Sequence, residues 1–121
     1  EMGTIAVPWP DEVPLTEPGF VKVVTDRDGY GLYFSRSPIP FYRDAGERTY
    51  LKHVGLYAFK AAFLQQYAAL PQTPLEKAEA LEQLRALEHG HRIAVFISRY
   101  KGYEVNTPAD YEAFVARQKG R

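Results

Sequence analysis

The spacing of apolar side chains along residues 73–90 predicts an amphipathic helix. Its apolar positions follow the i, i+1, i+4, i+7 pattern of a stripe that faces a core, namely Ala80, Leu81, Leu84 and Leu87. The polar residues between them fall on the flanks and outer face of the predicted helix: Glu79, Glu82, Gln83 and Arg85. Such a helix buries its stripe against another layer, and we expect that layer to be a sheet.

Both ends of this predicted helix carry local signals. Thr73 is suited to cap the N-terminus, and Pro74 suits the first helical position, where no N–H partner is needed. Glu76 completes the spacing of a capping box with Thr73. Gly90 follows the last apolar position and is expected to end the helix. The sequence therefore predicts one continuous helix between these residues.

Stretches rich in β-branched and aromatic residues predict strands over residues 2–8, 20–25, 30–35, 51–59 and 92–97. Residues 26–29 have the composition of a turn, so the second and third strands are expected to pair as a hairpin. Two more helices are predicted, one over residues 61–69 and one from a cap at Thr107 to about residue 118. Prolines make residues 8–18 and 37–48 irregular connections.

The order of these elements predicts an α/β fold with a mixed sheet and flanking helices. A chain of 121 residues has the size of one domain, so we expect residues 1–121 to form a single domain. Strict βαβ alternation is missing, and no glycine-rich phosphate loop follows the first strand. The set of elements therefore resembles the back half of an α/β domain rather than a complete one.

The charges of the chain are balanced, with 15 basic and 15 acidic residues and a pI near 7.1. Because no run of like charge stands out, we expect no nucleic-acid partner and no binding to an anionic membrane surface. A small polar ligand remains compatible with this balance. The chain has no cysteine and no apolar stretch of membrane-spanning length, so we expect a cytoplasmic protein without disulfides.

Two pairs of residues are candidates for binding a ligand. Arg36 and Arg43 flank a proline-containing loop, where guanidinium groups are suited to a carboxylate or phosphate; the alternative is two surface arginines. His53 and Tyr57 lie four apart in a predicted strand and so point to one face. They line a cleft in the first interpretation and pack in the core in the second.

Three further polar residues each have two possible interpretations, one as part of a binding site and one as an ordinary structural residue. Glu82 and Gln83 flank the apolar stripe of the predicted helix, where they reach a ligand cleft or lie in solvent. Asn106 precedes the cap of the last helix, where its oxygen is a weak ligand for a divalent metal or part of an Asx turn. The three histidines lack the spacing of a zinc site, and no Ser-His-Asp arrangement is present.

Six segments, taken in order, resemble one enzyme family: residues 4–8, 21–24, 29–40, 53–57, 74–85 and 106–110. From Met2 to about Phe114 they resemble CMP-KDO synthetase, the 3-deoxy-manno-octulosonate cytidylyltransferase of lipopolysaccharide synthesis. The resemblance covers the C-terminal half of that family and implies part of a Rossmann-like nucleotidyltransferase fold. It also implies that the front half, which holds CTP and the first metal-binding aspartate, is missing from this chain.

The resemblance assigns the sugar-acid contacts of the family to six residues: Arg36, Arg43, His53, Tyr57, Glu82 and Gln83. The second metal-binding aspartate of the family falls on Asn106, a neutral and weaker ligand. Mg²⁺ is therefore implied for the family but in doubt for this chain. The loop after Asp44 is also shorter than is usual in the family.

Three hypotheses for the function follow. In the first, the chain is a truncated CMP-KDO synthetase homologue that keeps the sugar-acid-binding and dimerising half, forms a homodimer and does not transfer a cytidylyl group alone. In the second, a nucleotide-binding half on another polypeptide completes an active CTP:KDO cytidylyltransferase. In the third, the chain is a purely structural oligomerisation module.

Overall fold

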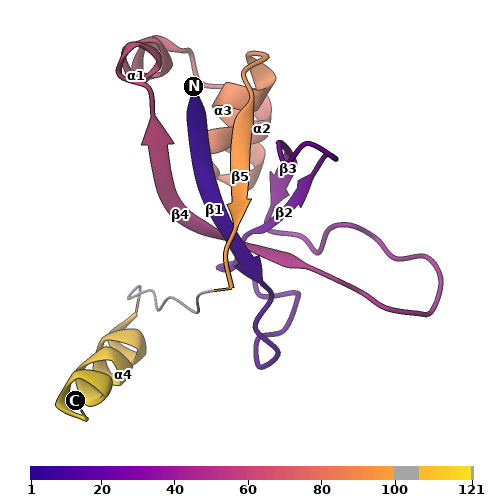
Figure 1. Ribbon diagram of the computed structural model, residues 1–121, viewed down its shortest axis with the longest axis vertical. Coiled ribbons are helices and arrows are strands. Elements are labelled where there is room, and N and C mark those ends of the chain that lie inside the picture. The colour runs from indigo at the N-terminus through magenta and orange to yellow at the C-terminus, as the bar shows by residue number, and fades with distance from the viewer. Residues whose placement is uncertain (100–106, 121) are drawn as a thin grey trace.

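The computed structural model describes residues 1–99 and 107–120. Its strands are β1 (Met2–Pro8), β2 (Lys22–Thr25), β3 (Gly31–Ser35), β4 (Leu51–Phe59) and β5 (Ile93–Ile97). Its helices are α1 (Ala61–Ala69), α2 (Pro74–Glu79), α3 (Gln83–Glu88) and α4 (Pro108–Lys119). The strands form one mixed sheet with helices beside it, which confirms the predicted fold class (Figure 1).

The sheet has the strand order β3-β2-β4-β1-β5. Strands β1 and β5 are parallel, whereas β1 with β4, β2 with β4 and β2 with β3 are antiparallel. The β2–β3 hairpin confirms the predicted turn, in which Gly29 has a φ of 87° that favours glycine. The tip of this hairpin reaches β5, because the Val95 N–H donates to the Gly29 carbonyl at 2.8 Å.

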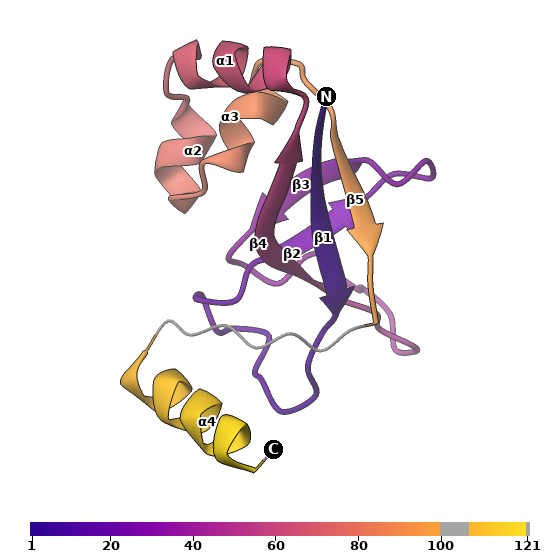
Figure 2. The ribbon, with the colours of Figure 1, turned by 60° about the vertical axis from the view of Figure 1, so that its left-hand side comes forward.

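One face of the sheet holds the core. Figure 2 shows α1, α2 and α3 gathered on the same side of the molecule. Along β1, Met2, Thr4 and Ala6 share one face, as a period of two requires, and all three are buried. They share the core with side chains from β3, α1, α3 and β5, among which Phe34, Leu84 and Ile93 have no exposed surface.

The predicted caps of two helices are present. Thr73 and Glu76 occupy the capping-box positions of α2, where the Thr73 N–H donates to Glu76 Oε1 at 3.3 Å and the buried Thr73 hydroxyl has no hydrogen-bond partner among the described residues. At α4, the Asp110 N–H donates to Thr107 Oγ1 at 3.1 Å and the Thr107 N–H donates to Asp110 Oδ2 at 3.0 Å. Among the described residues, no helix combines the length and apolar character that crossing a bilayer requires.

The prediction of one continuous helix over residues 73–90 is wrong, because the segment forms α2 and α3 with a turn between them. Ala80 lies in the left-handed region with φ 55°. The Leu81 N–H then donates to the Glu76 carbonyl at 3.2 Å, which is the closing bond of a Schellman-type helix end. The turn also reorients α3, so Gln83 is buried at 4% exposure rather than on the predicted outer face.

Arg36, which follows β3, explains why the helix ends there. Its Nε donates to the Glu79 carbonyl at 2.6 Å, and its Nη2 donates to the Ala80 carbonyl at 3.0 Å. Carbonyls at a helix C-terminus have no partner within the helix, so a guanidinium that binds two of them stabilises the break. This contact joins residues 44 positions apart in the sequence and has no local signature.

Replacing Ala80 by glycine is expected to stabilise the protein by about 0.5–1 kcal/mol, because glycine adopts a positive φ without a Cβ clash. Thermal or urea unfolding of Ala80→Gly measures this change. Ala78→Gly is the matched control, since Ala78 lies inside α2 and the same substitution there should cost about 1 kcal/mol. Destabilisation by Ala80→Gly would contradict the left-handed turn.

Candidate functional site

An irregularity in β4 brings His53 and Tyr57 together. Thr4 pairs with Tyr57 across the strands, and the next residue, Ile5, pairs with Val54, so β4 has two residues more than β1 at this point. In a regular strand, residues four apart are separated by about 13 Å. Here the ring centroids of His53 and Tyr57 lie 5.5 Å apart. The bulge thus brings the side chains of His53 and Tyr57 into contact.

His53 is buried at 7% exposure between β1 and the core. Its Nε2 lies 2.8 Å from Thr4 Oγ1, and its ring packs edge-on against Phe34 with centroids 5.0 Å apart. Burial away from water disfavours the charged imidazolium and lowers the pKa of His53 to about 4. The ring is therefore neutral at pH 7 and has one N–H and one acceptor nitrogen.

Tyr57 extends from the same strand toward α1 and α3. Its side chain keeps 38% exposure. Its pKa is raised, first by burial and then by the nearby Tyr67 and Glu82. The Tyr67 hydroxyl donates to the Glu82 carbonyl at 3.0 Å. Tyr57, Tyr67 and Glu82 therefore form one polar and aromatic edge where β4, α1 and α3 meet.

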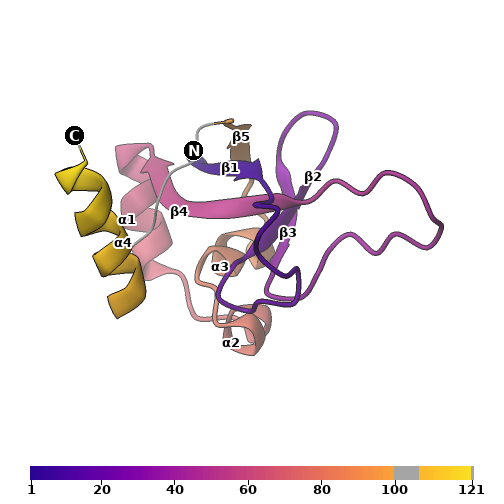
Figure 3. The same cartoon turned by 90° about the horizontal axis from the view of Figure 1, so that it is seen from below.

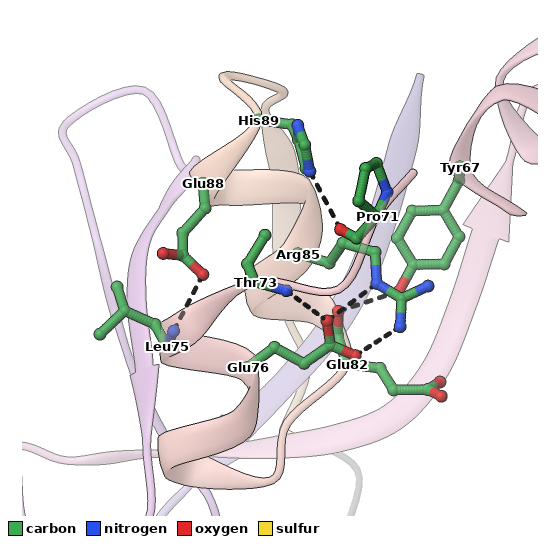
Figure 4. Close-up of polar contacts among 9 residues, drawn as sticks. All are labelled: Tyr67, Pro71, Thr73, Leu75, Glu76, Glu82, Arg85, Glu88 and His89. Atoms are coloured by element: carbon green, nitrogen blue, oxygen red, sulfur yellow. Dashed lines mark hydrogen bonds and ion pairs between the residues drawn. The ribbon is translucent and has the colours of Figure 1, made fainter. Parts of the chain in front are cut away.

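Glu76 and Arg85 form a bidentate ion pair beside this edge (Figure 4). Arg85 Nε donates to Glu76 Oε1 at 2.8 Å and Nη2 donates to Oε2 at 2.5 Å. The Arg85 guanidinium also lies over the Tyr67 ring, 5.8 Å from its centroid. The hydrogen bond from Arg85 is the largest influence on Glu76, and the pKa of this carboxyl is lowered. Sequence reasoning missed the ion pair.

An open hollow of about 420 Å³ lies over α2 and α3. Its lining residues are Gln72, Glu76, Lys77, Ala80, Leu81, Glu82 and Arg85. Both signs of charge and an amide are therefore present in one small space. Volumes of this order accommodate small-molecule ligands, and a polyhydroxylated acid would match the mixture of donors and acceptors.

The structure brings some of the predicted site residues to this region. Glu82 directly precedes α3 and is an exposed residue that lines the hollow. Arg36 does not line the hollow, but its guanidinium donates to the carbonyl of the lining residue Ala80 and to those of Glu79 and Pro18. Gln83 follows Glu82 but is buried at 4% exposure and does not line the hollow.

Two predicted residues are not part of this cluster. Arg43 is exposed on the loop between β3 and β4, and this loop projects away from α2 and α3 (Figure 3). Asn106, the candidate metal ligand, lies outside the described residues. Within residues 1–99 and 107–120, no group of three or more His, Asp or Glu side chains is arranged to hold a metal ion.

Comparisons with known proteins agree on one family. The family model described as "Cytidylyltransferase" matches residues 1–93. A 3-deoxy-manno-octulosonate cytidylyltransferase from Anaeromyxobacter sp. (strain Fw109-5) is 55% identical over 93% of this chain and 46% of its own length. An 8-amino-3,8-dideoxy-manno-octulosonate cytidylyltransferase from Shewanella sp. (strain ANA-3) is 50% identical over 91% of this chain and 45% of its own.

A solved structure agrees with these relatives. It is that of CMP:2-keto-3-deoxy-manno-octonic acid synthetase complexed with CTP, with a TM-score of 0.90 and 41% identity. The alignment covers 98% of this chain and 49% of that one. The chain therefore spans about half the length of the relatives it matches. It belongs to the cytidylyltransferase family and is similar to the CMP-KDO synthetases of that family over nearly all of its own length.

Proposed function

We propose that this chain is the sugar-acid-binding, C-terminal half of a CMP-KDO synthetase-like enzyme, and that it does not transfer a cytidylyl group by itself. The observation that carries the proposal is the contact of His53 with Tyr57, which the β4 bulge creates next to Glu82. An acceptor nitrogen, a phenol and a carboxylate at one edge are suited to the hydroxyl groups of a sugar. Relatives of this chain are named for two manno-octulosonates, which favours a ligand of this class.

The carboxylate of such a ligand needs a positive partner. Arg85 lines the hollow and Arg36 contacts the lining residue Ala80, and guanidinium groups bind carboxylates in a bidentate manner. Both guanidinium groups already make protein contacts, so only their remaining N–H groups would reach the ligand. Arg43 would join them only if its loop moved toward the hollow, and Asn106 would be a weak Mg²⁺ ligand at most.

A second candidate is one part of an active cytidylyltransferase, completed by a separate nucleotide-binding half. The half-length match to a synthetase complexed with CTP favours it. Co-expression with the other half of a relative tests this candidate, because formation of CMP-KDO in the mixture but not with either half alone would support it. If the two halves form a stable complex without forming CMP-KDO, the second candidate is contradicted, and sugar-acid binding without catalysis stays the proposed function.

Homodimer formation is the remaining part of the proposal. The sheet leaves apolar side chains in solvent, with Phe96 at 67%, Leu56 at 63% and Ile97 at 59% exposure. We propose that these exposed side chains contribute to a contact with another protein. Sedimentation of the purified chain measures its oligomeric state. An oligomer that does not bind KDO would favour the structural-module hypothesis instead.

Replacing Glu82 by glutamine is expected to weaken KDO binding about tenfold. A hydrogen bond to a charged acceptor is stronger than one to a neutral acceptor by about 1 kcal/mol, which corresponds to roughly this change in affinity. Isothermal titration calorimetry with KDO, with and without Mg²⁺ and CTP, measures the change. Glu82 is better suited to this test than Arg36, because Arg36 also holds the turn between α2 and α3.

The matched control is Glu12→Gln, which makes the same substitution at an exposed residue of the connection after β1. It should bind KDO as the wild type does. Equal affinity of Glu82→Gln and Glu12→Gln would remove Glu82 from the site. A folded wild type without KDO binding would contradict the proposed function.

A further inference from the structure

Thr4 lies beneath the bulge that forms the candidate site, and no hypothesis from the sequence involved its hydroxyl. The residue is buried at 2% exposure on β1. Its Oγ1 lies 2.8 Å from His53 Nε2, 2.7 Å from the Leu56 carbonyl and 3.2 Å from the Val54 carbonyl. The Thr4 hydroxyl thus contacts His53 and Val54, which precede the two extra residues of β4, and Leu56, which is one of those two residues.

The Thr4 hydroxyl can donate only one hydrogen bond, and this decides the direction of its contact with His53. A threonine hydroxyl has a single proton, and the Leu56 carbonyl is its nearest acceptor. If the hydroxyl donates there, it must accept from His53, which places the ring N–H on Nε2. The opposite arrangement, with the proton given to His53, would leave the Leu56 carbonyl facing an oxygen at 2.7 Å without a hydrogen bond.

With the proton on Nε2, His53 Nδ1 is an acceptor. No side chain or backbone group of residues 1–99 or 107–120 donates to this nitrogen. An unprotonated ring nitrogen accepts from a hydroxyl and repels a carboxylate, because both would present lone pairs. The tautomer of His53 therefore decides which group of a ligand it can bind.

We propose that Thr4 is a positioning residue that holds His53 in the Nε2–H tautomer, so that Nδ1 accepts a hydrogen bond from a hydroxyl group of the sugar acid. The same hydroxyl keeps the bulge closed and Tyr57 next to His53. Thr4 does not touch the ligand and acts only through its neighbours. The ligand part of this inference rests on the proposed function, whereas the tautomer is a property of the protein alone.

Nitrogen chemical shifts of ¹⁵N-labelled imidazoles distinguish the two tautomers, and the signal of His53 is identified by its loss in His53→Gln. The wild type is expected to have Nε2 protonated at pH 7. Thr4→Ser keeps the hydroxyl and should keep the tautomer. Thr4→Val keeps the shape of the side chain without the hydroxyl, and its His53 should shift toward the Nδ1–H tautomer.

KDO titrations of the same three proteins complete the test. Thr4→Ser should bind KDO within about twofold of the wild type, and Thr4→Val should bind at least fivefold more weakly. A wild-type His53 protonated on Nδ1 would overturn the proposal without any variant. It would also be overturned if Thr4→Val kept both the tautomer and the affinity. If the wild type does not bind KDO, the proposed function fails, and so does the bond between Nδ1 and a ligand hydroxyl. The role of Thr4 in holding the tautomer is tested separately, by the chemical shifts.

Discussion

Replacing Arg85 by methionine is expected to lower the free energy of unfolding by about 3 kcal/mol at pH 7. The substitution leaves the Glu76 carboxylate, with 4% side-chain exposure, without its bidentate partner. The Thr73 N–H at 3.3 Å is then its remaining hydrogen-bond donor among the described residues. Loss of one member of a buried ion pair typically costs about 3–5 kcal/mol, and the 19% exposure of Arg85 favours the lower end.

This loss should depend on pH with a defined sign. The pKa of Glu76 is lowered in the folded protein, chiefly by its hydrogen bond with Arg85. The stabilisation that the ion pair provides is therefore complete above the unfolded pKa of about 4.3 and is lost as the pH falls through the lower folded value. The difference in the free energy of unfolding between wild type and Arg85→Met should therefore become smaller below about pH 4.3.

Urea unfolding at pH 7 and at pH 3.5 measures both effects. Arg27→Met is the matched control, since Arg27 is exposed in the turn between β2 and β3 and its replacement should change stability by less than about 0.5 kcal/mol. A loss below about 1 kcal/mol in Arg85→Met at pH 7, or an equal loss at both pH values, would contradict the ion pair as described.

The wild type is expected to lose about 2 kcal/mol of stability between pH 7 and pH 5 because of His53. Burial lowers the pKa of His53 to about 4 in the folded protein, against about 6.5 when the chain is unfolded. Over this interval the unfolded chain binds a proton that the folded protein does not. The contribution is therefore fully present above pH 6.5 and is lost as the pH falls toward the folded value.

His53→Gln should remove most of this slope, because glutamine does not titrate and keeps a donor for Thr4. His89→Gln serves as the control, because it makes the same substitution at an exposed histidine. Urea unfolding of the three proteins at half-unit steps from pH 7 to pH 5 provides the measurement. A flat wild-type profile, or equal slopes in wild type and His53→Gln, would mean that His53 is not the buried neutral residue described here.

The candidate site was only partly predictable. Resemblance to a family pointed to His53, Tyr57 and Glu82, and the structure places these three residues at one edge. The same resemblance pointed to Arg43, whose loop projects away from them. Arg85 was assigned to an outer face because helical spacing describes one helix at a time, whereas its partner Glu76 belongs to another helix.

By itself, the sequence determined the elements whose causes are local. The strand over residues 51–59, the turn at residues 26–29 and the helix starts after Thr73 and Thr107 all appear where they were predicted. Each of these features depends on residues within about four positions of one another. Hydrogen bonding and side-chain period over such distances follow directly from the order of residue types.

Only the tertiary structure decided the break at Ala80, the burial of Gln83 and the contact of His53 with Tyr57. The break depends on Arg36, and the bulge in β4 is bonded to Thr4, which lies about 50 positions away in the chain. Helical spacing continues through Ala80 without interruption, and a strand pattern does not show which of its residues lack a partner. These features arise when distant segments satisfy each other's backbone groups, and no local pattern contains that information.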